Sequence, residues 1–220
     1  MAKPSSRGPA PGPTIIRQLA RLAGTPLPPS SPSVPDRLSQ WFDWNRAVAL
    51  QAALDGRLTP VEDDIPPFDA DQDADIARTR LELETAVAQV ATALAGADLD
   101  ACHRHHATLQ RSLQIATGRL RGRLRDMLSQ GTPAQARLAE VDALLEQVLA
   151  PRESQLLGGI SKALKQRPTP PPVDDDGDGQ DTVPGPAPPS FARELQALLH
   201  SELELRFHPI EGLLAALRTH

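Results

Sequence analysis

The chain has 220 residues, a net charge of -5, 23 prolines, no tyrosine and a single cysteine, Cys102. The acidic balance argues against a general nucleic-acid coat, and one cysteine excludes an intramolecular disulfide and fits a reducing compartment. Aromatic residues make up 3% of the chain, whereas sheets favour aromatic and β-branched residues and helices favour Ala and Leu. We therefore predict an all-α fold, an elongated helical bundle or coiled-coil hairpin.

The first 34 residues are rich in Pro, Ser and Gly and predict a flexible arm that contains a short amphipathic helix, Ile15 to Ala23. Arg17, Gln18 and Arg21 interrupt its apolar residues, so this stretch does not resemble a secretory signal. The sequence has no run of about 18 to 20 apolar residues, which is the length that a helix needs to span a bilayer. We expect a cytoplasmic protein without a transmembrane span.

Residues 35–166 predict the helical core. A helix is expected from Pro35 to Asp55, ended by Gly56, and the next from about Asp73 to Ala95, ended by Gly96. A further helix should run from its N-cap Asp98 to Gln130. Because only Gly96 and Ala97 separate these two helices, residues 73–130 predict an antiparallel hairpin.

The last part of this core opens with a capping box, in which Thr132 precedes Pro133 and Gln135 follows three residues after Thr132. The helix that follows is expected to kink or break at Pro151 or at Gly158-Gly159. A second capping box at Thr59-Pro60-Val61-Glu62 predicts only a single turn, because Pro66-Pro67 follows it.

Residues 167–189 are rich in Pro and Asp and predict a disordered linker. Residues 190–220 then predict an amphipathic helical segment, broken near His208-Pro209. We interpret this segment as a detached element for binding a partner, through Leu195, Leu199 and Leu203.

Arginines are concentrated between Arg104 and Arg125, where no acid lies between Ala101 and Arg125. Counting back from the hairpin turn places Asp75 beside Arg119, so acids of the preceding helix are expected to complement these arginines. An anionic partner or a solvated face remain the alternatives, with Arg119, Arg121 and Arg123 as interaction residues. Gly118 and Gly122 suggest either close approach by a neighbouring backbone or a weakly stable helix end.

Two features resemble metal sites and are discounted. Cys102 and His106 have the i, i+4 spacing of paired ligands, but a structural zinc needs further ligands and both residues fit an apolar seam. Asp174 begins a stretch similar to a calcium loop, but Gly185 stands where the bidentate Glu belongs. We expect no cofactor, no metal and no small-molecule substrate.

Trp41 and Trp44 lie one turn apart next to Phe42. In a chain poor in aromatic residues they are expected to form the largest packing unit of the core, and the alternative is that they anchor a partner. The sequence contains no Gly-rich phosphate loop and no nucleophile elbow. We therefore do not expect an enzyme.

The segment from Arg37 to Gly56, together with the helical hairpin, resembles a proteobacterial family known only as a domain of unknown function. The resemblance rests on the following residues: Leu38, Trp41, Asp43, Trp44, Ala49, Asp55 and Gly56. That family has no assigned activity, so no functional residue carries over. Its genes are associated with a proton channel of the TolQ/MotA type and an OmpA-like protein, which implies a cytoplasmic accessory of an envelope complex.

The leading hypothesis is a non-enzymatic helical adaptor or scaffold that binds other proteins and is capable of self-association. The alternative is a regulator that binds nucleic acid through the Arg-rich helix face, although the acidic chain argues against it.

Overall fold

The structure is a computed structural model that describes residues 36, 40–56, 68–165 and 189–219, without the side chains of residues 159–165 and 189. Every regular element in these residues is a helix, which confirms the all-α prediction. The helices are α3 (Trp44–Leu54), α4 (Ala70–Ala88), α5 (Val90–Ala93), α6 (Leu99–Ser129), α7 (Pro133–Lys165) and α8 (Pro189–Arg218).

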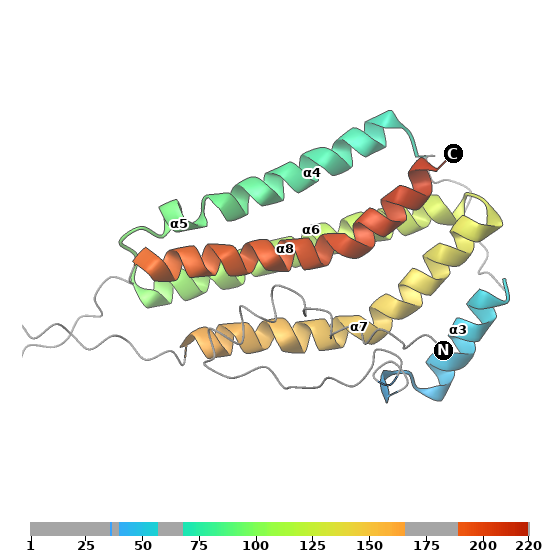
Figure 1. Ribbon diagram of the computed structural model, residues 1–220, viewed down its shortest axis with the longest axis horizontal. Helices are drawn as coiled ribbons and strands as arrows, with labels where there is room; N and C mark the ends of the chain where they lie inside the picture. Colours follow the sequence, from blue (N-terminus) through green and yellow to red (C-terminus); the bar gives the residue numbers. More distant parts are fainter. Residues whose placement is uncertain (1–35, 37–39, 57–67, 166–188, 220) are drawn as a thin grey trace, which may run out of the picture.

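Four long helices form an elongated bundle (Figure 1). α6 and α8 lie side by side in its middle and run in the same direction, while α4 and α7 run in the opposite direction on either side of them. α3 packs against α7 on the outside of the bundle. Contacts between side chains fix the register of α8, because Arg80 pairs with Glu211, Arg218 with Asp73, and Gln110 donates a hydrogen bond to Glu202.

The local signals at both ends of α6 are confirmed. The Asp98 side chain caps α6 by accepting a hydrogen bond of 2.6 Å from the backbone N–H of Ala101. Gly96, in the turn before it, has a φ of +76°, a left-handed conformation that glycine adopts without strain. At the start of α7, Thr132 N–H donates to Gln135 Oε1 and Gln135 N–H donates to Thr132 Oγ1, as the capping box predicts.

Two helix boundaries differ from the predictions. The helix expected from Asp73 to Ala95 begins at Ala70, capped by Asp69, and is interrupted at Gln89 between α4 and α5. The helix expected to begin at Pro35 is continuous only from Trp44 onward. The reason is that the Asp43 carboxylate accepts a hydrogen bond from the backbone N–H of Arg46 and so caps the helix there.

The interpretation of the C-terminal segment as a detached element is wrong. α8 is part of the core, and its interaction candidates Leu195, Leu199 and Leu203 are buried against the other helices of the bundle. Burial of a leucine side chain contributes about 1.5 to 3 kcal/mol, so this helix gains more by packing than it could by remaining free in water. The boundary between a core at 35–166 and a separate segment at 190–220 therefore does not hold.

α7 and α8 both contain an internal proline and both continue through it. Pro151 lies near the midpoint of α7, where Figure 1 shows the helix bending. The break expected at His208-Pro209 is absent, because α8 runs on to Arg218. Pro209 cannot donate a hydrogen bond to the carbonyl of Leu205, but Phe207 and Ile210 on either side of it are buried and hold the helix together.

Several predictions concern residues outside the described part of the chain. These are the helix from Ile15 to Ala23, the turn at Thr59 and the linker 167–189, of which only Pro189, the first residue of α8, is described. Among the helices that are described, none is both long and apolar enough to cross a membrane.

Candidate functional site

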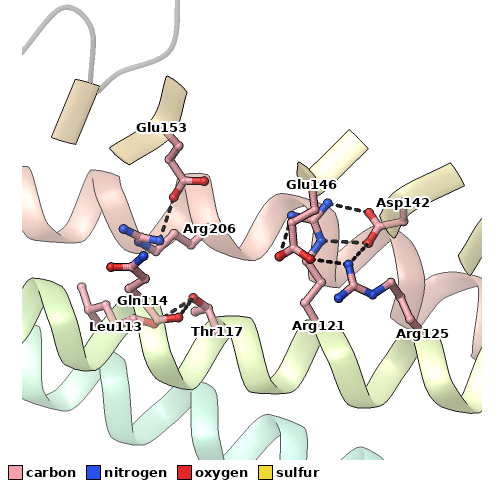
Figure 2. A network of polar contacts seen from close by, with 9 residues as sticks. All are labelled: Leu113, Gln114, Thr117, Arg121, Arg125, Asp142, Glu146, Glu153 and Arg206. Atoms are coloured by element: carbon pink, nitrogen blue, oxygen red, sulfur yellow. Dashed lines mark hydrogen bonds and ion pairs between the residues drawn. The ribbon is translucent and has the colours of Figure 1, made fainter. Parts of the chain in front are cut away.

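The most extensive polar cluster lies between α6 and α7 (Figure 2). Arg121 donates from Nε to Asp142 Oδ2 over 2.8 Å and from Nη2 to Asp142 Oδ1 over 2.7 Å. Both side chains are largely buried. Burial lowers the pKa of Arg121, but hydrogen bonding to Asp142 and the negative charges of Asp142, Glu146 and Glu153 together outweigh burial and raise the pKa overall, so the guanidinium stays charged.

A second arginine and a second carboxylate complete this cluster. Arg125 Nη1 lies 3.4 Å from Asp142 Oδ2 and also pairs with Glu146, whose Oε1 lies 3.6 Å from Arg121 Nη1. Arg121 and Arg125 are four residues apart, and so are Asp142 and Glu146. Each pair therefore faces the other from one side of its helix, and the cluster fixes how α6 and α7 meet.

A separate cluster ties α8 to its neighbours. Glu202 has no solvent exposure, and it accepts hydrogen bonds from Arg206 Nε and Nη2 at 3.0 and 2.8 Å and from Gln110 at 3.0 Å. Burial raises the pKa of the Glu202 carboxyl, while Arg206 acts in the opposite direction. Arg206 Nη1 also lies 2.7 Å from Glu153 Oε1, but this buried oxygen has no hydrogen bond within the described residues.

A cavity of about 210 Å³ lies between the two clusters, among α6, α7 and α8. Arg121 and Glu146 line it on one side, and Arg206 and Glu153 on the other. Since both arginines are held by carboxylates, the lining offers no free cation to a ligand and can accommodate ordered water. We interpret the two clusters and the cavity as a structural network that fixes the register of three helices.

The prediction that acids of the preceding helix pair with the arginines of α6 is wrong. Arg121 binds acids of α7 instead of α4, and Asp75 pairs with Arg78 of its own helix instead of lying in an ion pair with Arg119. Arg119 and Arg123 are exposed, and neither forms an ion pair with a described residue. The arginine-rich stretch therefore divides into a buried side, which binds α7, and an outward side.

Cys102 and His106 lie in the apolar seam of α6, as predicted. His106 has an exposed fraction of 1%, and its Nε2 has no hydrogen-bond partner within the described residues. Burial, followed by the nearby His103 and His105, lowers its pKa to about 4, so it is neutral in the folded protein near pH 7. Burial also raises the pKa of the Cys102 thiol, which makes it a poor nucleophile.

The expectation that both tryptophans belong to the core is wrong for Trp44. Its side chain is 81% exposed, and Val48 and Leu54 on the same helix are each 50% exposed. α3 contacts α7 through its opposite side, where Ala53 is buried. Trp41 is half-buried, with the Arg152 guanidinium 5.8 Å from its ring centre. We refer to Trp44, Val48 and Leu54 as the α3 apolar face.

Sequence reasoning missed the buried partners Asp142, Glu146, Glu202 and Arg206. One signal was present in each case, because Asp142 and Glu146 repeat the i, i+4 spacing of Arg121 and Arg125, and Glu202 precedes Arg206 by four residues. Neither spacing says whether the pair is exposed or buried.

Within the described residues, no group of three or more His, Cys, Asp or Glu side chains is arranged to hold a metal ion. The geometry thus defines a class of protein, an all-α four-helix bundle stabilised by buried ion pairs and carrying an apolar helix face on its outside. The chain belongs to the family described as protein of unknown function DUF3348, which it matches over residues 1–219. This confirms the predicted membership of a family of unknown function. No curated protein and no solved structure matches the chain.

Proposed function

We propose that this protein is a non-enzymatic helical adaptor that binds another protein through the α3 apolar face. The observation that carries the proposal is the 81% exposure of Trp44. Tryptophan is the residue most enriched at the energetic centres of protein interfaces, because one side chain removes a large apolar area from water.

The support of α3 strengthens the proposal. α3 is capped by Asp43 at its start, Gly56 with a φ of +78° follows its C-cap residue Asp55, and its inner side rests on α7. The α3 apolar face is therefore presented on an ordered helix. Trp44 and Val48 are one turn apart, so a partner could cover both at once. A helix lying in a groove of its partner is a common way to bury such a face.

As the biological setting, we propose a cytoplasmic accessory of an envelope complex of the proton-channel type. This part of the proposal rests on the family resemblance alone. Self-association is compatible with the adaptor function, because two copies could cover each other's exposed apolar residues.

A regulator that binds nucleic acid is the second candidate. The observation in its favour is the set of exposed arginines on α6 that form no ion pair with described residues: Arg104, Arg111, Arg119 and Arg123. Arg121 and Arg125 do not contribute, because α7 carboxylates hold them. The net charge of -5 weakens the general attraction for a polyanion.

The test is affinity purification of the tagged full-length chain from its native host, compared with the variant Trp44→Ala/Val48→Ala/Leu54→Ala. These side chains are exposed, so the variant should keep the thermal stability of the wild type. Leu81→Ala, which removes an exposed leucine from α4, is the matched control. The proposal requires a partner that is retained by the control and lost by the triple variant. If the triple variant recovers the same proteins as the wild type, the α3 apolar face is not the docking site.

A further inference from the structure

We propose that the cavity among α6, α7 and α8 binds a small organic ammonium ion as a ligand. The charged group of this ligand lies at Glu153, and its aliphatic part lies against apolar side chains of the lining. The cavity shares no residue with the α3 apolar face, so the proposal does not depend on the function proposed above. Four features of the cavity support it: an excess of negative charge, a free backbone carbonyl, an apolar surface and enough room.

The charges around the cavity leave one carboxylate in excess. The cluster between α6 and α7 contains two arginines and two carboxylates and is therefore neutral. In the α8 cluster, by contrast, the single Arg206 is shared by Glu202 and Glu153, which Figure 2 shows from the side of Glu153. Arg206 Nε and Nη2 donate to Glu202, while Nη1 lies 2.7 Å from Glu153 Oε1 without forming a hydrogen bond. One negative charge of this cluster therefore has no cation of its own among the described residues.

The charge of Glu153 acts at both ends of the cavity. Burial and, to a smaller extent, the negative charge of Glu153 raise the pKa of Glu202. At the opposite end, hydrogen bonding to Asp142 and, as a weaker cause, the charge of Glu153 raise the pKa of Arg121 against the effect of burial. Like charges repel strongly where few water molecules screen them, so the excess carboxylate favours a ligand of positive charge. An anion is not favoured, because both arginines of the lining already donate to carboxylates.

Pro209 leaves a second acceptor for the ligand. Proline has no N–H, so the carbonyl of Leu205, four residues earlier, lacks the donor that a helix normally provides. Leu205 and Pro209 line the same cavity as Glu153. An ammonium group carries three donors and no acceptor. A carboxylate and a backbone carbonyl are therefore suitable partners for it.

The rest of the lining suits a short aliphatic chain. Four of its residues present apolar side chains: Leu149, Ala150, Leu205 and Pro209. Sites for small molecules typically combine such a surface with a few polar groups that orient the ligand. The volume of about 210 Å³ has room for roughly seven water molecules of about 30 Å³ each, which a ligand of about five non-hydrogen atoms can replace in part. A metal ion fits less well, because no three carboxylate, histidine or cysteine side chains of the described residues are arranged to hold one.

Gly118 keeps the entrance of the cavity open. It is exposed and lines the cavity together with the exposed residues Gln114 and Ser154, which places the entrance between α6 and α7. A Cβ atom added to Gly118 or to Gly122 would meet no atom of the described chain within 4 Å, so the expected close approach of a neighbouring backbone does not occur within these residues. Gly122 does not line the cavity. A side chain at position 118 therefore has room to enter the cavity, and position 122 provides a matched control.

The experiment titrates the full chain with n-butylamine at pH 7 and follows the backbone amide signals by NMR. The comparison probes are 1-butanol and butyrate, which keep the aliphatic chain and replace the positive charge with no charge or with a negative one. We expect saturable binding of n-butylamine with a Kd on the order of millimolar, as its small size implies. Both comparison probes should bind at least about tenfold more weakly, because Glu153 attracts neither of them. The signals that shift most should be those of residues that line the cavity, Gly118 among them.

Two pairs of variants test charge and room separately. Glu153→Gln should weaken the binding of n-butylamine at least about tenfold, because it removes the excess charge and leaves Arg206 with a single carboxylate. Its control, Glu204→Gln, removes an exposed carboxylate of α8 that does not line the cavity and should leave the Kd unchanged. Gly118→Leu should also weaken binding about tenfold, because the new side chain occupies the cavity, whereas Gly122→Leu should not.

The proposal is overturned if n-butylamine shows no saturable binding, if 1-butanol binds as tightly, or if Glu153→Gln or Gly118→Leu binds n-butylamine as well as the wild type does. Equal weakening by Gly122→Leu would also overturn it, because the loss would then not depend on the cavity. Thermal unfolding checks that each variant is folded, and the charge variant and the glycine variant test the proposal independently of each other. The Trp44→Ala/Val48→Ala/Leu54→Ala variant should bind n-butylamine normally, so failure of this proposal and failure of the adaptor proposal are distinguishable.

Discussion

Arg121 and Asp142 form a two-pronged ion pair between α6 and α7, with hydrogen bonds of 2.8 and 2.7 Å, in a place where both side chains are largely buried. Such a pair fixes the relative position of two helices, because neither charge can be left alone without a large penalty. In contrast, Arg119 lies two residues away on the outward side of the same helix.

Arg121→Met should lower the free energy of unfolding by about 3 kcal/mol, because Asp142 would keep only its longer contact with Arg125. The matched control Arg119→Met should change it by less than about 0.5 kcal/mol. Urea denaturation at pH 7 measures both. The double variant Arg121→Met/Asp142→Leu should regain part of the loss, since it leaves no buried charge unpaired. Equal effects of Arg121→Met and Arg119→Met would contradict the assignment of two sides to α6.

His106 should make the fold sensitive to acid. Its pKa is lowered to about 4 in the folded protein, whereas an unfolded histidine has a pKa of about 6.5. The unfolded chain therefore binds the proton first as the pH falls, and stability is lost between about pH 6.5 and pH 4. This single histidine should lower the free energy of unfolding by about 2 kcal/mol between pH 7 and pH 5.

The check on this prediction is the difference in unfolding free energy between pH 7 and pH 5, measured for the wild type and for His106→Leu. The variant should lose about 2 kcal/mol less than the wild type over this range, because leucine does not titrate. Replacement of the exposed Leu81 by Ala, which removes no titratable group, is the control and should behave as the wild type does. An unchanged pH dependence in His106→Leu would show that other groups cause the acid sensitivity.

Leu199→Ala should lower the free energy of unfolding by about 3 kcal/mol, because Leu199 has no solvent exposure and the substitution leaves a cavity in the core. His200→Ala changes the next residue, which is exposed, and should have little effect. Thermal unfolding of the two variants compares them directly. If both variants unfold like the wild type, α8 is not part of the core, and the result would support a detached C-terminal segment instead.

Pro209→Ala should raise the free energy of unfolding by about 2 kcal/mol, since alanine can donate a hydrogen bond to the Leu205 carbonyl and proline cannot. Leu205 and Pro209 line the cavity between α6, α7 and α8, so the gain would be smaller if ordered water already satisfies this carbonyl. Chemical denaturation measures the change. Destabilisation by Pro209→Ala would indicate that the core requires proline at this point of α8.

Much of the fold could be predicted from local signals. Asp98, Gly96 and the pair of Thr132 and Gln135 mark helix ends through hydrogen bonds to their immediate neighbours, and the sequence spacing contains that information. The burial of α8 could not be predicted in this way. An amphipathic pattern shows that leucines such as Leu199 need to be covered, but it does not identify the helix that covers them.

For the candidate interaction residues, too, the sequence did not show which side chains are exposed and which are buried. Arg119 and Arg121 are equivalent in the sequence, yet they point to different sides of α6 because two residues correspond to about 200° of rotation around a helix. Trp44 was expected in the core on account of its size. The contact of the opposite side of α3 with α7 leaves it outside, and this contact depends on tertiary structure.

The most direct test of the adaptor proposal is cross-linking inside the native host with a photoreactive amino acid placed at position 44, at position 48 or, as a control, at the exposed position 81 on α4. We expect that positions 44 and 48 yield an adduct of the same mass, that position 81 does not, and that Leu54→Asp removes the adduct. Absence of an adduct at position 44, or the same adduct at position 81, would contradict the claim that the α3 apolar face binds a specific partner.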